Sequence, residues 1–84
     1  MGKVLLENGY RIIINTNDHS PPHVHVWKND GVLIVYLNGE DGDQEGVLWV
    51  REARDLKVQE IRRALQLVQN NHALCIQKWE EIHG

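Results

Sequence analysis

Three of the five histidines lie within a ten-residue stretch, Asp18 to Trp27, which also holds both prolines. His23 and His25 alternate with valines, so an extended backbone places both imidazoles on one face of a strand. Two imidazoles in this arrangement can share a metal ion, or they can act as a general acid and a general base near neutral pH. This stretch is therefore the first candidate for chemistry in the chain.

Two further side chains, Asp18 and His19, come just before the histidine strand on a loop stiffened by the prolines. For acid–base chemistry, the catalytic candidates are His23 and His25, with Asp18 orienting one of them. For a metal site, the ligands would be His19, His23 and His25, with Asp18 as the alternative third ligand and zinc or another divalent transition metal as the ion. Otherwise the pattern requires no cofactor, and the histidines would cap a sheet edge or bond to loop backbone.

The turn residues of the sequence predict the strands that position these side chains. Asn8-Gly9 and Asn29-Asp30-Gly31 separate apolar runs in the way that tight turns of antiparallel hairpins do. The runs predict strands over residues 4–7, 10–15, 23–28 and 32–37. A further short strand is predicted over residues 47–50, after an acidic, glycine-rich loop over residues 38–46, and residues 51–55 are read as a transition.

From residue 56 onward the apolar residues follow spacings of three and four, which predicts a helix. We expect one long, bent helix with Asp55 as its N-cap, and two in-line helices that meet at Asn70-Asn71 are the alternative. The lone cysteine, Cys75, is interpreted as a core residue rather than a nucleophile. The apolar stripe consists of Val58, Ile61, Leu65, Val68, His72, Cys75, Trp79 and Ile82.

Together these elements predict one α+β domain over residues 1–84. It is a small, mostly antiparallel sheet of four or five strands, with the C-terminal helix or helices packed on one face. Trp27 shares the histidine face, and we expect it to be a core residue under the helix. If the helix packs on Val24 and Val26 instead, the histidines form a shallow surface, and an exposed Trp27 would indicate an interface.

Composition limits the function classes. The formal net charge is −3, which argues against a general nucleic-acid binder, although RNA stays a possible partner. A ribonuclease built on the histidines would use Arg11 or Lys28 to steady phosphate charge. No apolar run approaches the ~18–20 residues of a membrane span, and a secretion signal is lacking. With a single cysteine, these features predict a cytoplasmic protein without a membrane partner.

The segment Asn17 to Val26, followed by a glycine-led apolar strand and a helix with Trp79 near its end, resembles a known group. It is similar to the small bacterial family called domain of unknown function 4160, whose hallmark is an Asp…Pro-Pro-His-Val-His-Val segment. The likeness extends from Gly9 through the helix, and the acidic loop is longer than in typical members. The motif positions here are Asp18, Pro21, Pro22, His23 and His25.

The resemblance implies a prokaryotic protein of a family often suggested to belong to toxin–antitoxin pairs, and it supplies no catalytic residues. We therefore expect a protein-interaction module of a toxin–antitoxin-type pair, with a protein partner. The alternatives are a small hydrolase or ribonuclease that uses the His23 and His25 pair, and a metal-binding protein that uses the same histidines. The oligomeric state stays open.

Overall fold

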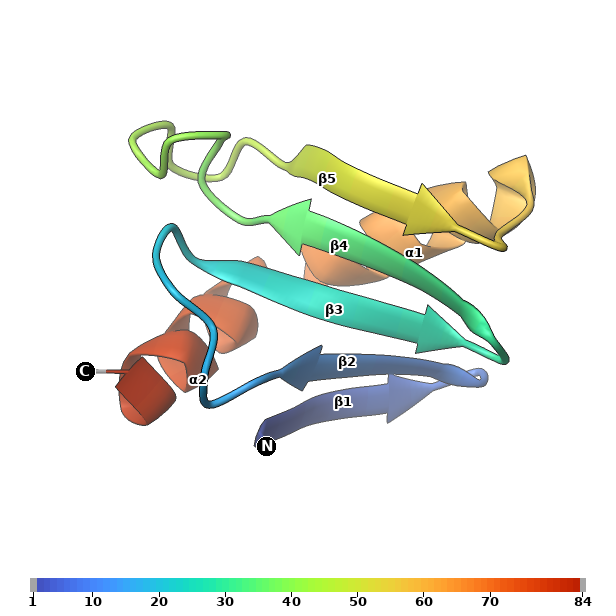
Figure 1. Cartoon of the computed structure of the whole chain (residues 1–84), viewed down its shortest axis with the longest axis horizontal. Coiled ribbons are helices and arrows are strands. Elements are labelled where there is room, and N and C mark those ends of the chain that lie inside the picture. The colour runs from blue at the N-terminus through green and yellow to red at the C-terminus, as the bar shows by residue number, and fades with distance from the viewer. Residues whose placement is uncertain (1, 84) are drawn as a thin grey trace.

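The computed structural model describes residues 2–83. Five strands form one antiparallel sheet in chain order, and two helices follow the last strand (Figure 1). This confirms the predicted α+β class. The strands are β1 (Gly2–Glu7), β2 (Tyr10–Ile14), β3 (His23–Lys28), β4 (Gly31–Tyr36) and β5 (Trp49–Arg54), and the helices are α1 (Val58–Asn70) and α2 (His72–His83).

Both two-residue turns form where the sequence places them. Asn8 and Gly9 have φ angles of 51° and 82°, the positive values that this hairpin turn demands of both residues. Asn29, in the turn between β3 and β4, has a φ of 55°. The second turn pairs Lys28 with Gly31, and the ladder then continues without a shift to the far end of β3. The histidine strand is therefore central and held by pairing along its length.

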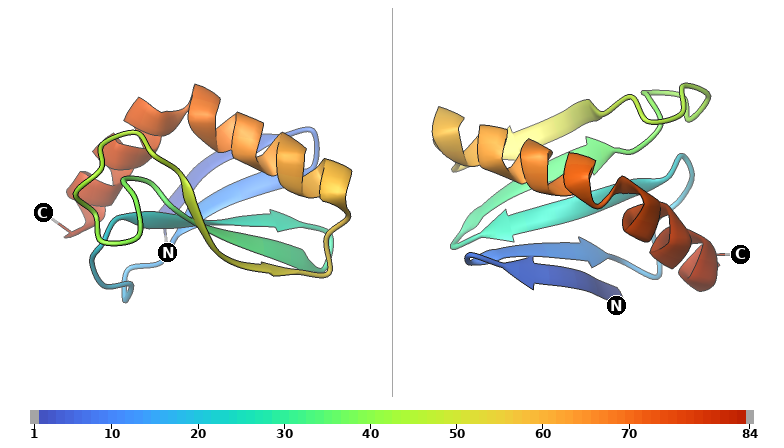
Figure 2. Two further views of the ribbon diagram at one scale, coloured as in Figure 1. Left: turned by 90° about the horizontal axis from the view of Figure 1, so that it is seen from above. Right: turned by 180° about the vertical axis from the view of Figure 1, so that it is seen from behind.

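Both helices lie on the same face of the sheet (Figure 2). The hydrophobic core fills the space between the helices and this face of the sheet. Val24 and Val26 of β3 are buried on this face, at 0% and 1% exposure. From the helices, Val68, Cys75 and Trp79 pack into the same core. This confirms the core position expected for Cys75, and Trp79 of the same apolar stripe is buried beside it. His23, His25 and Trp27 therefore lie on the other face of β3, and of these His23, at the start of the strand, is still in contact with Trp79 of α2.

The expected core position of Trp27 is wrong. Trp27 is half-buried and stands outside the core cluster, on the face opposite the helices. The reason is the period of two along β3, which turns Trp27 away from Val24 and Val26. The helices pack on the valine face because β2 and β4 extend it with large, fully buried side chains, among them Ile12, Ile14 and Leu33.

The helical region is two helices rather than one long helix. Asn71 ends α1: its side-chain amide donates to the carbonyl oxygen of Leu67 at 2.8 Å, and its φ is −120°. A side chain that hydrogen-bonds to a backbone carbonyl competes with the backbone N–H groups that would continue the helix. Asparagine ends helices in this way. Within residues 2–83, no helix combines the length and the apolar character needed to cross a bilayer.

The start of α1 also differs from expectation. Lys57, not Asp55, is the N-cap, because Asp55 has a φ of 55° and lies three residues before Val58, the first residue of α1. The carboxylate of Glu60 accepts the backbone N–H of Lys57 at 2.8 Å, which satisfies one of the free donors at this end. Val58, the first residue of the apolar stripe, is 65% exposed and does not reach the core.

The last strand lies further along the chain than the predicted 47–50. It pairs with β4 from Trp49 to Arg54, and residues 51–54, read as a transition, belong to it. An edge strand needs no apolar alternation, because most of its side chains face solvent. The exposed, charged residues of β5 therefore hid it from a pattern based on hydrophobicity.

Gly31 gives a test of the β3–β4 turn and its packing against the start of the helical region. A Cβ atom at this position would collide with the carbonyl oxygen of Asp55 and with the side chain of Leu56. We expect Gly31→Ala to lower the free energy of unfolding by about 1–3 kcal/mol, the usual cost of overpacking, measured by urea denaturation. Asp30→Ala, at the neighbouring exposed position, should change it by no more than about 0.5 kcal/mol. Equal losses in the two variants would contradict this packing.

Candidate functional site

The loop between β2 and β3 fixes the position of Asp18. The backbone N–H of Asn15 donates to Oδ2 of Asp18 at 3.2 Å, and the N–H of Asp18 donates to the Asn15 carbonyl at 3.1 Å. Such reciprocal bonds are how aspartate closes a turn. At the other end of the loop, the carbonyl of Pro22 accepts the N–H of Leu37 at 2.9 Å. The loop is therefore tied to the sheet at both ends, with the Asp18 carboxylate held inward.

Asp18, His23 and His25 come together into one cluster, which we call the Asp-His-His trio. Oδ2 of Asp18 lies 3.4 Å from Nε2 of His23 and 3.7 Å from Nδ1 of His25. These three atoms all lie within 4.8 Å of one another. The side chains are 16%, 11% and 16% exposed, respectively, so the trio is mostly buried. Each of the three side chains therefore offers one potential ligand atom close to the other two.

The tautomer of His23 follows from its second ring nitrogen. Nδ1 lies 2.9 Å from the carbonyl oxygen of Pro21, and because a carbonyl only accepts, Nδ1 must carry the proton. In the neutral ring, Nε2 then presents a lone pair toward the carboxylate of Asp18. The rings of Tyr36 and Trp79, each with its centroid 5.2 Å away, pack against His23 and fix its orientation.

His25 is a neutral imidazole with an unused nitrogen. Burial lowers its pKa below the ordinary 6.5, and the nearby His23 lowers it further, while the carboxylates of Asp18 and Glu52 act against this. Its Nδ1 is buried and has no hydrogen-bond partner within the described residues. A buried nitrogen left unpaired is unfavourable, so this atom is suited to a ligand that supplies the missing contact.

The other residues expected at the site lie elsewhere. His19 is exposed and does not belong to the trio, so the loop residue that joins the two strand histidines is Asp18. Arg11 is exposed and pairs with Trp27 on the histidine face. Lys28 is on the opposite face, where its ammonium lies 4.8 Å from the centre of the Tyr10 ring. Lys28 therefore cannot serve the histidines.

Sequence reasoning missed three groups that hold His23: the Pro21 carbonyl, Tyr36 and Trp79. The signal for Tyr36 was available, because a two-residue turn after Lys28 places His23 opposite Tyr36 by simple counting. No comparable signal existed for Trp79. Its contact depends on how α2 lies across the end of the sheet, which follows from the break at Asn71.

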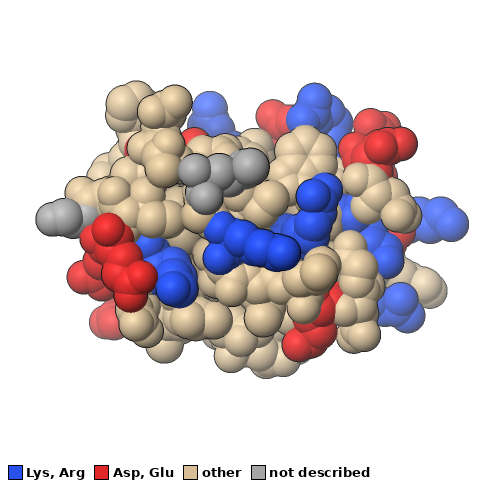
Figure 3. All heavy atoms as spheres, turned by 90° about the horizontal axis from the view of Figure 1, so that it is seen from below, with Lys and Arg blue, Asp and Glu red and all other residues tan. Residues whose placement is uncertain are grey.

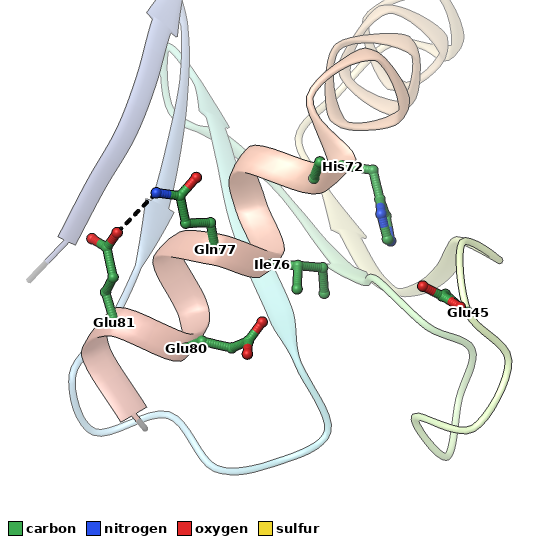
Figure 4. A pocket seen from close by; sticks show the side chains of 7 residues that line it. Glu45, His72, Ile76, Gln77, Glu80 and Glu81 are labelled. Carbon is green, nitrogen blue, oxygen red and sulfur yellow. Dashed lines mark hydrogen bonds between the residues drawn. The ribbon is translucent and has the colours of Figure 1, made fainter.

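A hollow of about 560 Å³ beside α2 is separate from the trio (Figure 4). Glu45, from the acidic loop, faces Glu80 and Ile76 of α2 across it. His72 joins the two sides, since its Nε2 lies 2.8 Å from the carbonyl oxygen of Leu37, just before the loop. The acidic loop thus packs along α2, and it supplies no residue to the trio.

Cys75 supplies no nucleophile. It is fully buried, and burial raises the pKa of its thiol to about 11. A thiol with this pKa is protonated at neutral pH, whereas reactive cysteines have lowered pKa values. This agrees with its interpretation as a core residue.

A family model described as Domain of unknown function (DUF4160) matches residues 9–80. The chain belongs to this family. The matched range begins just before β2 and ends within α2, so it contains the whole trio and the aromatic residues around His23. No match was found among curated proteins or among solved structures.

The lowered pKa of His25 predicts a pH-dependent stability. His25 binds a proton more tightly in the unfolded chain than in the folded protein. Its contribution to the free energy of unfolding is therefore fully present above pH 6.5. It is lost as the pH falls from 6.5 through the lowered pKa. We expect the free energy of unfolding, measured in urea at pH 7.5 and pH 5, to fall more in the parent protein than in His25→Gln. Equal falls would show that His25 does not cause the loss.

Proposed function

We propose that this protein binds a divalent transition-metal ion through Asp18, His23 and His25. The observation that carries the proposal is the convergence of three electron-pair donors with no hydrogen bond between them. In a neutral His23 ring, the proton on Nδ1 leaves Nε2 with a free lone pair, and an ionised carboxylate has no proton to donate. A cation between these ligand atoms would satisfy all three at once.

The spacing of the donors supports an ion of this kind. Ligand bonds of 2.0–2.1 Å in a tetrahedral site place neighbouring ligand atoms about 3.3 Å apart. The two distances from Asp18, 3.4 and 3.7 Å, are close to this value and longer than good hydrogen bonds. Two histidines and one carboxylate are a ligand set used by zinc and by non-haem iron, and such sites leave at least one position open.

The surroundings of His23 support the same proposal. Metal-bound histidines usually donate their other ring N–H to a carbonyl or carboxylate, which fixes the tautomer and the direction of the ring. The Pro21 carbonyl stands at that position. The lowered pKa of His25 adds to this, because a ligand histidine must be neutral.

The geometry favours ion binding over acid–base cleavage of RNA by the same histidines. A general acid or base must present a ring nitrogen to its substrate. Here Nδ1 of His25 is buried, and Nε2 of His23 faces Asp18 rather than solvent. The two cations suggested for phosphate do not join the trio: Lys28 is on the opposite face, and Arg11 lies beside Trp27. A small ion needs neither an exposed nitrogen nor these cations.

Zinc titration by calorimetry tests the proposal. Asp18→Asn, His23→Gln and His25→Gln should each weaken Zn²⁺ binding by at least about 100-fold, because even second-shell partners contribute 10–100-fold to metal affinity. His19→Gln is the matched control, since it removes a nearby, exposed histidine, and should leave the affinity unchanged. Circular dichroism checks that each variant is folded. Absence of Zn²⁺, Co²⁺ or Ni²⁺ binding to the parent protein, or an equal loss in His19→Gln, would refute the metal site.

A second proposed function is that of an interaction module in a toxin–antitoxin-type pair. The half-buried indole of Trp27 supports it, because this side chain lies on the face opposite the helices. Trp49, also half-buried, pairs with Tyr36 and their rings lie 5.5 Å apart on this side of the sheet. Partly exposed aromatic residues gathered on one face are typical of protein interfaces.

Co-expression with the product of the adjacent gene tests this second proposal. We expect a complex that Trp27→Ala weakens by at least about tenfold, since buried tryptophans are frequent interface hot spots. Val58→Ala, which removes an exposed apolar side chain at the start of α1, should have no effect. A protein that stays monomeric and unbound in this experiment would argue against the role.

A further inference from the structure

A second hollow lies at the other end of β3, on the face that carries the helices. It has a volume of about 340 Å³, at the lower end of the range for small-molecule sites. The β1–β2 hairpin and the end of β3 form one side, and the second half of α1 forms the other. Its lining residues are Glu7, Asn8, Tyr10, Lys28, Arg63, Gln66, Leu67 and Asn70.

Two cations line this hollow from opposite sides. The ammonium of Lys28 donates to the Asn8 carbonyl at 3.2 Å and lies over the Tyr10 ring, which fixes its position above the hairpin turn. Only one of its three N–H donors is used in that bond. Arg63, on α1, is exposed, and no acid lies within salt-bridge distance of it among residues 2–83.

One residue that lines the hollow, Tyr10, carries a polar group without a partner. Tyr10 is 5% exposed, and its hydroxyl is buried with no hydrogen-bond partner in the described part of the chain. Nearby, Gln66 donates to the side-chain oxygen of Asn70 at 2.9 Å. That bond leaves the amide N–H₂ of Asn70 and the carbonyl oxygen of Gln66 available for a ligand.

We propose that this hollow binds a small organic phosphate that carries hydroxyl groups, such as a sugar phosphate. Lys28 and Arg63 would hold the phosphate, because a guanidinium and an ammonium are the side chains best suited to its charge. Glu7 repels a second anionic group but accepts hydrogen bonds from hydroxyls. The ligand is therefore anionic at one end and rich in hydroxyls at the other.

The distribution of charge favours a small ligand over a nucleic acid. The formal net charge of the chain is −3. On the face along the β1 edge, Lys and Arg lie across the middle and also at the upper and right margins, where acidic side chains lie among them (Figure 3). A nucleic-acid surface needs cations along an extended path. The hollow is partly open and offers two cations and one acid, which is enough for one phosphate group.

Calorimetry with ribose 5-phosphate and inorganic phosphate tests the proposal on the full chain. Ribose 5-phosphate should bind at least tenfold more tightly than inorganic phosphate. Arg63→Gln should weaken ribose 5-phosphate binding at least tenfold. Arg62→Gln is the matched control, because it removes the same charge from the next residue of α1, which lines a different hollow, and the affinity should stay within twofold.

Lys28→Gln adds a second probe of the phosphate end, and circular dichroism confirms that the variants fold. Three results would overturn the proposal. They are no binding of ribose 5-phosphate at millimolar concentration, equal affinity for the sugar phosphate and inorganic phosphate, and equal losses in Arg62→Gln and Arg63→Gln. Tighter binding of a short RNA that depends on both arginines alike would also overturn it, in favour of a nucleic-acid surface. Zinc titration of the same variants is unaffected, because none of them touches the trio.

Discussion

The burial of Val24 and Val26 against the helices fixes the direction of every other side chain in β3. Each buried valine stabilises the fold by about 1.5–3 kcal/mol relative to an exposed one. A slip of one residue in the register would exchange the two faces, placing imidazoles in the core and valines in solvent. The register is therefore strongly defined, and it holds His23 and His25 side by side on the opposite face. The geometry of the trio depends on this constraint before any polar contact forms.

The trio itself is an unfavourable arrangement for the free protein. A carboxylate and two imidazoles are mostly buried with distances too long for good hydrogen bonds, and one nitrogen has no partner. The fold nevertheless holds Asp18 in place through two backbone bonds to Asn15 and orients His23 through Pro21. A preorganised ion site requires ligand atoms that are already fixed and have no other partner. Ion binding then needs no free energy to order these ligands.

The parts of the fold that were predictable depend on local rules. Asn8-Gly9 and the turn at Asn29 specify hairpins because few residues adopt positive φ angles, and strand alternation then orders the two faces of β3. The missed parts depend on tertiary context. The choice of the helix-covered face, which placed Trp27 outside the core, depends on the combined apolar area of three strands.

The residues of the candidate site also divide into those predictable from local rules and those that depend on tertiary context. The sequence identified both strand histidines and offered Asp18 and His19 as loop partners. Only the turn bonds between Asn15 and Asp18 decide between the two loop residues. The periodicity of the sequence does not predict the contacts made by α2, such as that of Trp79 with His23. These contacts depend on the angle between α1 and α2.

The two proposed sites are positioned to act independently. The trio uses the start of β3 on one face, and the phosphate hollow uses its end, at Lys28, on the other. Lys28 lies three residues along β3 from His25, the nearest member of the trio, or about 10 Å. The two sites share no residue, so β3 is the element that connects them. Loss of one activity in a variant of the other site would therefore require a change in β3 itself, and its stability to urea would reveal that change.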